Sequence, residues 1–99
     1  MRLDLSRAAR DDLAEIYHYS KSRWGADQAA AYLDRMQSRI DALVRGEVSG
    51  VAGHDVSPGV RRQISGSHII WYRVQDDILR VIRVLHQSRD VGGGWRRAA

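Results

Sequence analysis

Two amphipathic helical patterns follow one another in the first half of the chain, with only a short turn between them. From Arg7, apolar residues recur at the spacing of one helix face, and this series stops at Gly25. A second series runs from Ala29 to Val44 and stops before Gly46. So short a connection predicts that the helices fold back as an antiparallel hairpin. Their apolar faces need a further surface to cover them, which the rest of the chain has to supply.

Three β-rich runs in the second half supply that surface. The runs RRQIS, HIIWYRV and ILRVIRVLH are separated by tight breaks at SGS and QDD, which predicts an antiparallel meander. The alternating RLDL at residues 2–5 predicts one more strand, and Ser6 after it is a suitable helix N-cap. We therefore expect an α+β fold of order β-α-α-β-β-β, with the helical hairpin packed on one face of a small, mainly antiparallel sheet.

The length of 99 residues allows one small domain. Residues 46–59, GEVSGVAGHDVSPG, are glycine-rich and contain the only proline, which predicts a long irregular connection. A GGG run starts at residue 92. We therefore expect a single domain over residues 1–91 and a flexible C-terminal tail over residues 92–99.

Conventional enzyme motifs are absent from the sequence. It has no phosphate-binding glycine loop, serine nucleophile elbow or zinc-ligand spacing, and it has no cysteine. The acidic cluster Asp11, Asp12 and Glu15 fits a solvated first helical turn better than a metal site. We therefore expect no metal and no cofactor. No apolar run could cross a membrane and no signal pattern opens the chain, so a cytoplasmic protein is expected.

The net positive charge is confined to the second half of the chain. Residues 1–49 carry eight basic and eight acidic side chains, whereas residues 50–99 carry eight arginines against four aspartates. Guanidinium groups suit bidentate contacts with phosphate or carboxylate, although a genome-wide preference for arginine would give the same composition. The candidate electropositive group comprises Arg61, Arg62, Arg73, Arg80, Arg83, His86 and Arg89.

The arrangement of this group depends on the turn between the last two strands. If Asp76 and Asp77 are its two central residues, Arg73 lies opposite Arg80, which costs stability unless an acidic group or anion lies nearby. In this register Val74 pairs with Leu79, Tyr72 with Val81 and Ile70 with Arg83, while Trp71, Arg73, Arg80, Ile82, Val84 and His86 share the other face. A three-residue turn would exchange these pairings. In a regular strand, Arg83 and His86 point to opposite faces.

Several motifs in this order resemble the ParE branch of the RelE/ParE toxins of bacterial toxin–antitoxin systems. They are RWG followed by QA, PG-x-R before a strand, H-x-I-x-YRV, and RVLH-x-x-RD, and the resemblance covers roughly residues 3 to 90. The loop GEVSGVAG departs from the Asn-Pro and Gly of many relatives. The resemblance implies the β-α-α-β-β-β fold and a toxin neutralised by a ParD-like antitoxin encoded beside it. It also implies DNA gyrase as the target, whereas RelE-type relatives cut messenger RNA on the ribosome.

Metal-free cleavage of RNA needs a base, an acid and cationic groups that converge on one phosphate. In the alternative reading as a RelE-like endoribonuclease, His86 would be the acid or base, with Arg61, Arg73 or Arg83 at the phosphate. No tyrosine follows Tyr72 and no lysine follows Lys21, so the supply of acid and base is poor. We therefore expect a toxin that binds gyrase and performs no chemistry of its own.

The expected partners are the antitoxin and gyrase. A helical hairpin on a small sheet leaves a groove and a sheet edge, which an amphipathic or extended antitoxin segment could cover. Tyr17, Trp24 and Tyr32 are the candidate anchors of that segment. We expect a hetero-oligomer that contacts operator DNA only through the antitoxin, since a net charge of +4 without a recognition helix supports at most weak DNA binding. A third reading is an inactive toxin-fold interaction or co-repressor module.

Overall fold

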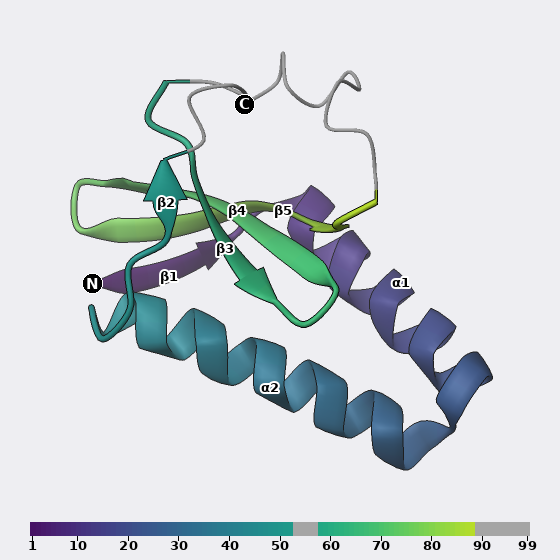
Figure 1. Cartoon of the computed structure of the whole chain (residues 1–99). Helices are drawn as coiled ribbons and strands as arrows, with labels where there is room; N and C mark the ends of the chain where they lie inside the picture. The colour runs from purple at the N-terminus through teal and green to yellow at the C-terminus, as the bar shows by residue number, and fades with distance from the viewer. Residues whose placement is uncertain (53–57, 89–99) are drawn as a thin grey trace.

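Two helices pack on a five-stranded sheet in the computed structural model, which describes residues 1–52 and 58–88 (Figure 1). The predicted α+β architecture is confirmed. The elements in order are β1 (Arg2–Leu5), α1 (Arg7–Trp24), α2 (Ala26–Val44), β2 (Val51–Ala52), β3 (Arg61–Ser65), β4 (His68–Gln75) and β5 (Ile78–His86). The prediction of an irregular connection over residues 46–59 missed β2, which pairs with β3. Arg89 and the predicted tail at residues 92–99 lie outside the described residues.

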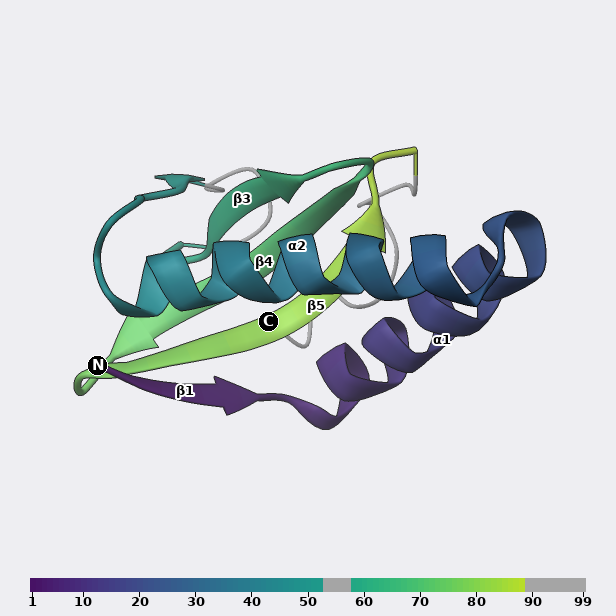
Figure 2. The same ribbon diagram turned by 90° about the horizontal axis from the view of Figure 1, so that it is seen from below.

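The helical hairpin is set by local signals that the sequence contains. The Ser6 hydroxyl accepts the Ala9 N–H at 2.9 Å and so caps the start of α1. Gly25 has φ 89°, where a side chain would be strained, and its N–H donates to the Lys21 carbonyl at 2.9 Å. Figure 2 shows α2 running across the sheet, in front of β3, β4 and β5. The two helices cover one face of the sheet, and no helix or strand among residues 1–52 and 58–88 lies over the other, which we call the open face (Figures 1 and 2). No helix in the described part of the chain is long and apolar enough to cross a membrane.

The strands lie in the order β1-β5-β4-β3-β2, with β1 parallel to β5 and the other pairs antiparallel. Asp76 and Asp77 both have positive φ, 54° and 61°, as a two-residue hairpin turn of matching twist requires. Of the two turns that the sequence left open, the structure has the two-residue one, and with it the pairing of Arg73 with Arg80. Asp4 of β1 lies beside Arg80 and forms an ion pair with it, which offsets the repulsion between the two arginines.

A β-bulge changes the register further along this hairpin. Tyr72 pairs with Val81 as predicted, but Trp71 pairs with Arg83, so Ile82 is an extra residue on β5. The predicted pairing of Ile70 with Arg83 is wrong, because Ile70 lies opposite Val84. The bulge also moves Val84 and His86 to the helix-covered face, which corrects their predicted placement on the open face.

The main core lies between the helices and the sheet. Its buried members are Ala9, Ile16, Met36, Ile40, Leu43, Ile70, Tyr72, Leu79, Val81 and Val84. A smaller cluster on the open face consists of Val60, Trp71 and Leu85, with Ile69 and Ile82 packed against it. Leu85 belongs to the open face and Val84 to the helix face, so Arg83 and His86 diverge, as predicted from strand alternation.

Candidate functional site

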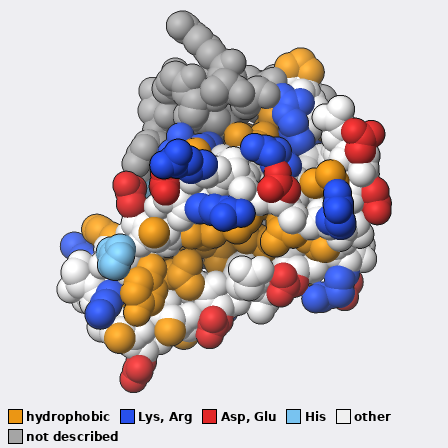
Figure 3. Space-filling view, turned by 180° about the vertical axis from the view of Figure 1, so that it is seen from behind, with side chains coloured by type: hydrophobic (Ala, Val, Ile, Leu, Met, Phe, Trp, Pro, Cys, Tyr) orange, Lys and Arg blue, Asp and Glu red, His pale blue; other side chains and the backbone are white. Residues whose placement is uncertain are grey.

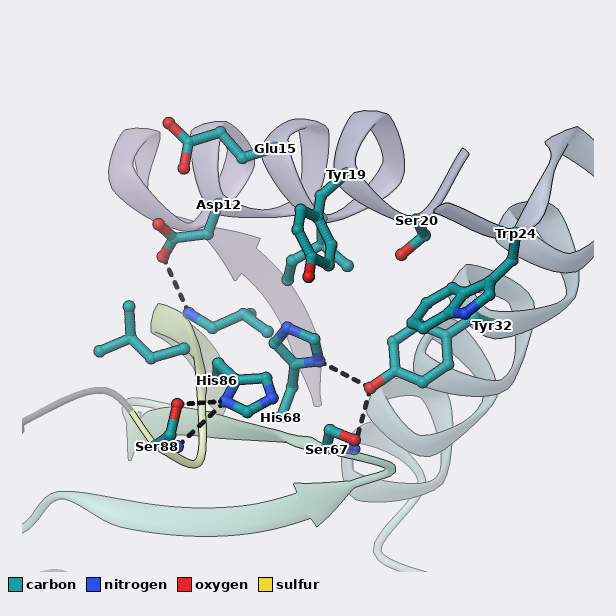
Figure 4. A pocket seen from close by; sticks show the side chains of 13 residues that line it. Asp12, Glu15, Tyr19, Ser20, Trp24, Tyr32, Ser67, His68, His86 and Ser88 are labelled. Carbon is teal, nitrogen blue, oxygen red and sulfur yellow. Dashed lines mark hydrogen bonds between the residues drawn. The ribbon is translucent and has the colours of Figure 1, made fainter. Parts of the chain in front are cut away.

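A groove of about 520 Å³ opens where α1, the start of α2, the β3–β4 turn and the end of β5 meet (Figure 4). Its lining comprises Asp12, Glu15, Ile16, Tyr19, Ser20, Trp24, Tyr32, Ser67, His68, Val84, Leu85, His86 and Ser88. Aromatic side chains from the helices lie on one side of the groove, and two histidines from adjacent strands lie on the other. We take this groove as the candidate binding site because concave, largely apolar surfaces with a few polar groups are the usual ligand sites of proteins.

The two histidines lie directly opposite each other on neighbouring strands. His68 of β4 pairs with His86 of β5, and their ring centroids are 5.3 Å apart with the rings nearly perpendicular. The Tyr32 hydroxyl lies 2.6 Å from Nδ1 of His68 and accepts the Ser67 N–H at 2.9 Å. Tyr32 therefore connects α2 to the β3–β4 turn and holds the His68 ring in place (Figure 4).

The protonation of His86 follows from its own hydrogen bonds. The Ser88 N–H donates to Nδ1 of His86 at 3.0 Å, and the Ser88 hydroxyl lies 2.7 Å from the same atom. Because a backbone N–H can only donate, Nδ1 is the acceptor and the neutral ring carries its proton on Nε2. His86 therefore offers a hydrogen-bond donor to the groove.

Burial, and to a smaller extent the neighbouring His86, lower the pKa of His68 from 6.5 to about 4. The unfolded chain has a pKa near 6.5, so between these pH values it binds a proton that the folded protein does not. The free energy of unfolding therefore falls as the pH drops from about 6.5 to about 4. We expect a loss of about 1–2 kcal/mol, allowing for solvent that reaches the half-buried ring.

Urea unfolding at pH 7.5 and pH 4.5 measures this loss, and the variant His68→Gln isolates it from the titration of carboxylates. The variant should lose less stability than the wild type over this interval, and the exposed His18→Gln should behave like the wild type. An NMR titration that gave His68 a pKa near 6.5 would contradict the assignment.

Asp12 closes the groove at the α1 end, and the prediction of a solvated acidic cluster is wrong for this residue, although Asp11 and Glu15 are exposed as predicted. Its carboxylate is 9% exposed and accepts two hydrogen bonds from Arg83, both at 2.8 Å, and one from the Val84 N–H at 2.9 Å. The hydrogen bonding between Arg83 and Asp12 is the main reason why the pKa of Arg83 is raised. The pairing of β1 with β5 ends at Val81, so β1 offers no acceptor to the Val84 N–H. The Asp12 carboxylate accepts that hydrogen bond instead. Asp12 is therefore a structural residue.

The predicted electropositive group does not form one cluster. The side chains of Arg62, Arg73 and Arg80 lie on the open face of the sheet. There, Arg62 packs over the Trp71 ring. Arg61 donates to the Gly50 carbonyl, and Arg83 is held by Asp12. His86 lines the groove on the other side of the sheet. The arginines and His86 therefore do not converge on one point.

Two of the three predicted anchor residues lie in the groove. Trp24 and Tyr32 line it, and both also line a neighbouring pocket of about 350 Å³ with Gln28, Ala31 and Arg35. Tyr17 packs edge-on against His18 and lines neither pocket. Sequence reasoning missed Glu15, Tyr19 and Ser20 as groove residues. Their only signal was helical spacing from Asp12 and Ile16, which does not reveal what they face.

The back of the molecule also carries exposed apolar surface. Figure 3 shows hydrophobic side chains gathered in a band, with lysine and arginine side chains lying above it. On the helical hairpin, Tyr19 and Trp24 are 59% and 51% exposed, and their rings meet edge to face. Exposed aromatic side chains beside a groove are typical of a surface that binds another protein.

Comparisons with known proteins agree on one family. Residues 3–91 match the family model described as the ParE toxin of the type II toxin–antitoxin system, parDE. The chain is 43% identical over 84 residues to Toxin ParE1 of Caulobacter vibrioides, covering 85% of this chain and 86% of that protein. It is 42% identical over 88 residues to Toxin ParE1 of Mycobacterium tuberculosis, covering 88% and 90%.

A solved structure described as the chromosomal ParDE TA system from P. aeruginosa shares the fold. The TM-score is 0.76 at 22% sequence identity, and the match covers 87% of this chain and 95% of the other. At this identity the likeness concerns the fold alone, whereas the sequence matches extend over most of each protein. The chain therefore belongs to the ParE toxin family of type II toxin–antitoxin systems.

Proposed function

We propose that this toxin acts in the cytoplasm by binding and inhibiting DNA gyrase, and that a ParD-like antitoxin encoded beside it neutralises it. Membership of the ParE family supports the toxin role. The observation that favours binding over cleavage is that His86 and Arg73 lie on different sides of the sheet, while Arg61 and Arg83 are held by Gly50 and Asp12. The antitoxin would hold the toxin in a hetero-oligomer and supply any contact with operator DNA.

A ribonuclease would need these groups together. An acid, a base and a cation must meet at one scissile phosphate. His86 faces the helices, whereas Arg73 lies across the sheet from it and Arg83 already binds Asp12 at 2.8 Å. Using Arg83 at a phosphate would leave the Asp12 carboxylate without its partner. This arrangement makes the RelE-like reading the weaker of the two.

We assign the gyrase contact to the open face of the sheet. Arg62, Arg73 and Arg80 lie on this face, where Arg62 packs over the Trp71 ring, Arg73 donates to the Pro58 carbonyl and Arg80 pairs with Asp4. Arg80 is exposed, and its ion pair with Asp4 is exposed as well, so little stability depends on it. A basic face of this kind suits an acidic protein surface or gyrase-bound DNA.

Reversing two of these charges tests the assignment. The variant Arg73→Glu/Arg80→Glu should bind gyrase at least tenfold more weakly in low salt, because each substitution replaces attraction by repulsion. Binding of labelled chain to purified gyrase measures this directly. Arg10→Glu, an exposed arginine on α1, serves as the control and should retain affinity. Unchanged binding of the double variant, with its fold intact by circular dichroism, would remove the open face from the proposal.

A further inference from the structure

We propose that two copies of this chain associate through the outer edge of β1, where their β1 strands pair antiparallel and join the two sheets into one. The partner in this inference is a second copy of the chain, so its charge pattern is known. The inference goes beyond the proposed gyrase contact and depends on neither gyrase nor the antitoxin.

The outer edge of β1 has backbone groups that a second strand could pair with. β1 is the last strand at its end of the sheet, and no strand in the described part of the chain pairs with its outer side (Figure 2). The N–H groups of Arg2 and Ser6 donate inward, to carbonyls of the β4–β5 turn and of β5, at 2.9 and 3.0 Å. Backbone groups alternate in direction along a strand, so Leu3 and Leu5 direct their N–H and C=O groups outward. Such an edge is a template for another strand.

The side chains of β1 that face the helices are apolar and incompletely covered. Leu3 and Leu5 pair with Leu79 and Val81, which belong to the main core, so both lie on the helix-covered face. Met1 shares that face by strand alternation. Met1 and Leu3 are 43% and 38% exposed, so apolar surface continues from the core to the edge of the sheet. A second β1 beside this edge would cover it.

The side chains on the open face of β1 are complementary to a second copy of themselves. Antiparallel pairing centred on Leu3 places Leu3 opposite Leu3 of the second copy, Met1 opposite Leu5, and Arg2 opposite Asp4. Arg2 is exposed and forms no ion pair within the described residues. The Asp4 side chain is 42% exposed beside Arg80, which leaves room for a second cation. The dimer therefore contains two Arg2–Asp4 pairs, one on each side of its two-fold axis.

This register is the one that the charges select. Sliding one strand by two residues in either direction places Arg2 against Arg2 or Asp4 against Asp4, which is destabilising. Sliding it by one residue places charged side chains on the apolar face. In the selected register the two-fold axis is perpendicular to the sheet. The helices of both copies then lie on one side, and the two open faces lie together on the other.

The test is sedimentation equilibrium of purified full-length toxin without antitoxin. We expect a monomer–dimer equilibrium with a dissociation constant on the order of 10–100 µM, because the paired strands are short and the interface is small. Arg2→Asp and Asp4→Arg should each raise this constant at least about tenfold, since each variant places like charges opposite at both pairs. An equimolar mixture of the two variants should dimerise as the wild type does, because every charged pair is then complementary again.

Arg10→Asp is the matched control, since it changes an exposed arginine of α1 that lies outside β1, and it should stay within about threefold of the wild type. Circular dichroism confirms that each variant is folded. A wild type that stays monomeric up to about 300 µM, well above the affinity expected of a small interface, would overturn the inference. A dimer that Arg2→Asp and Asp4→Arg leave intact would place the contact on another surface, and a mixture that stays monomeric would exclude the proposed register.

Discussion

Replacement of Asp12 by alanine lowers the free energy of unfolding by about 3–5 kcal/mol, the usual cost of breaking a buried ion pair. The Asp12 carboxylate is the acceptor for two Arg83 hydrogen bonds and for the Val84 N–H. Alanine leaves a guanidinium that is only 23% exposed without its counter-charge, and a buried backbone donor without an acceptor. A small domain has about 5–15 kcal/mol of total stability, so this variant should be close to unfolding.

Urea unfolding followed by circular dichroism measures the effect, and two variants locate its cause. Asp12→Asn keeps an oxygen for the Val84 N–H but loses the charge, so its loss should be smaller, about 1–3 kcal/mol. Asp11→Ala removes the adjacent exposed carboxylate and should change stability by less than about 0.5 kcal/mol. Equal stability of the Asp12→Ala and Asp11→Ala proteins would refute the structural role.

Replacement of Trp24 by alanine should weaken antitoxin binding by about 2–4 kcal/mol, which is a loss of at least about 30-fold in affinity. Trp24 lines both the groove and the neighbouring pocket, and it is the larger of the two aromatic side chains that the two pockets share. Its side chain is 51% exposed in the free toxin, so the folded toxin itself should lose little stability. The effect is therefore expected in binding and not in unfolding.

The comparison for Trp24→Ala is Val74→Ala, which removes an exposed apolar side chain, 46% exposed, near the end of β4. Calorimetry with the antitoxin should show near wild-type affinity for this control. Wild-type affinity of the Trp24 variant would exclude the groove as the main antitoxin site.

Local signals made the helical half of the fold predictable. The Ser6 cap and the Gly25 stop act within one turn of the residues they affect, so they can be identified without knowledge of the fold. The Asp76-Asp77 turn is local in the same sense, and it fixed the register as far as Tyr72 and Val81.

Features that depend on distant contacts were not predictable. The bulge at Ile82 leaves no mark in the sequence, because this strand has apolar residues on both sides: Val81 and Val84 pack under the helices, and Ile82 and Leu85 pack on the other face. In the sequence, Asp12 resembles any acidic residue near the start of a helix. Its role appears only when α1 lies beside β5, because its partner Arg83 is 71 residues away along the chain. The short β2 needs β3 beside it to form at all.

The candidate site was predicted in part for the same reason. Trp24 and Tyr32 were predicted as anchors for the antitoxin, and the structure places both in the walls of the groove and of the neighbouring pocket. Tyr17 was placed with them, but it lies on another part of the α1 surface. His68 and His86 come together only through strand pairing, so neither the pair nor its link to Tyr32 could be found from spacing.

Supercoiling by purified gyrase, titrated with the toxin in the presence and absence of antitoxin, tests the central claim most directly. We expect inhibition that depends on the toxin-to-gyrase ratio and is reversed by the antitoxin. The His86→Ala variant should inhibit gyrase as the wild type does, because His86 performs no chemistry. Unaffected gyrase at toxin concentrations that stop growth, together with cutting of ribosome-bound messenger RNA that His86→Ala abolishes, would contradict it and favour the endoribonuclease.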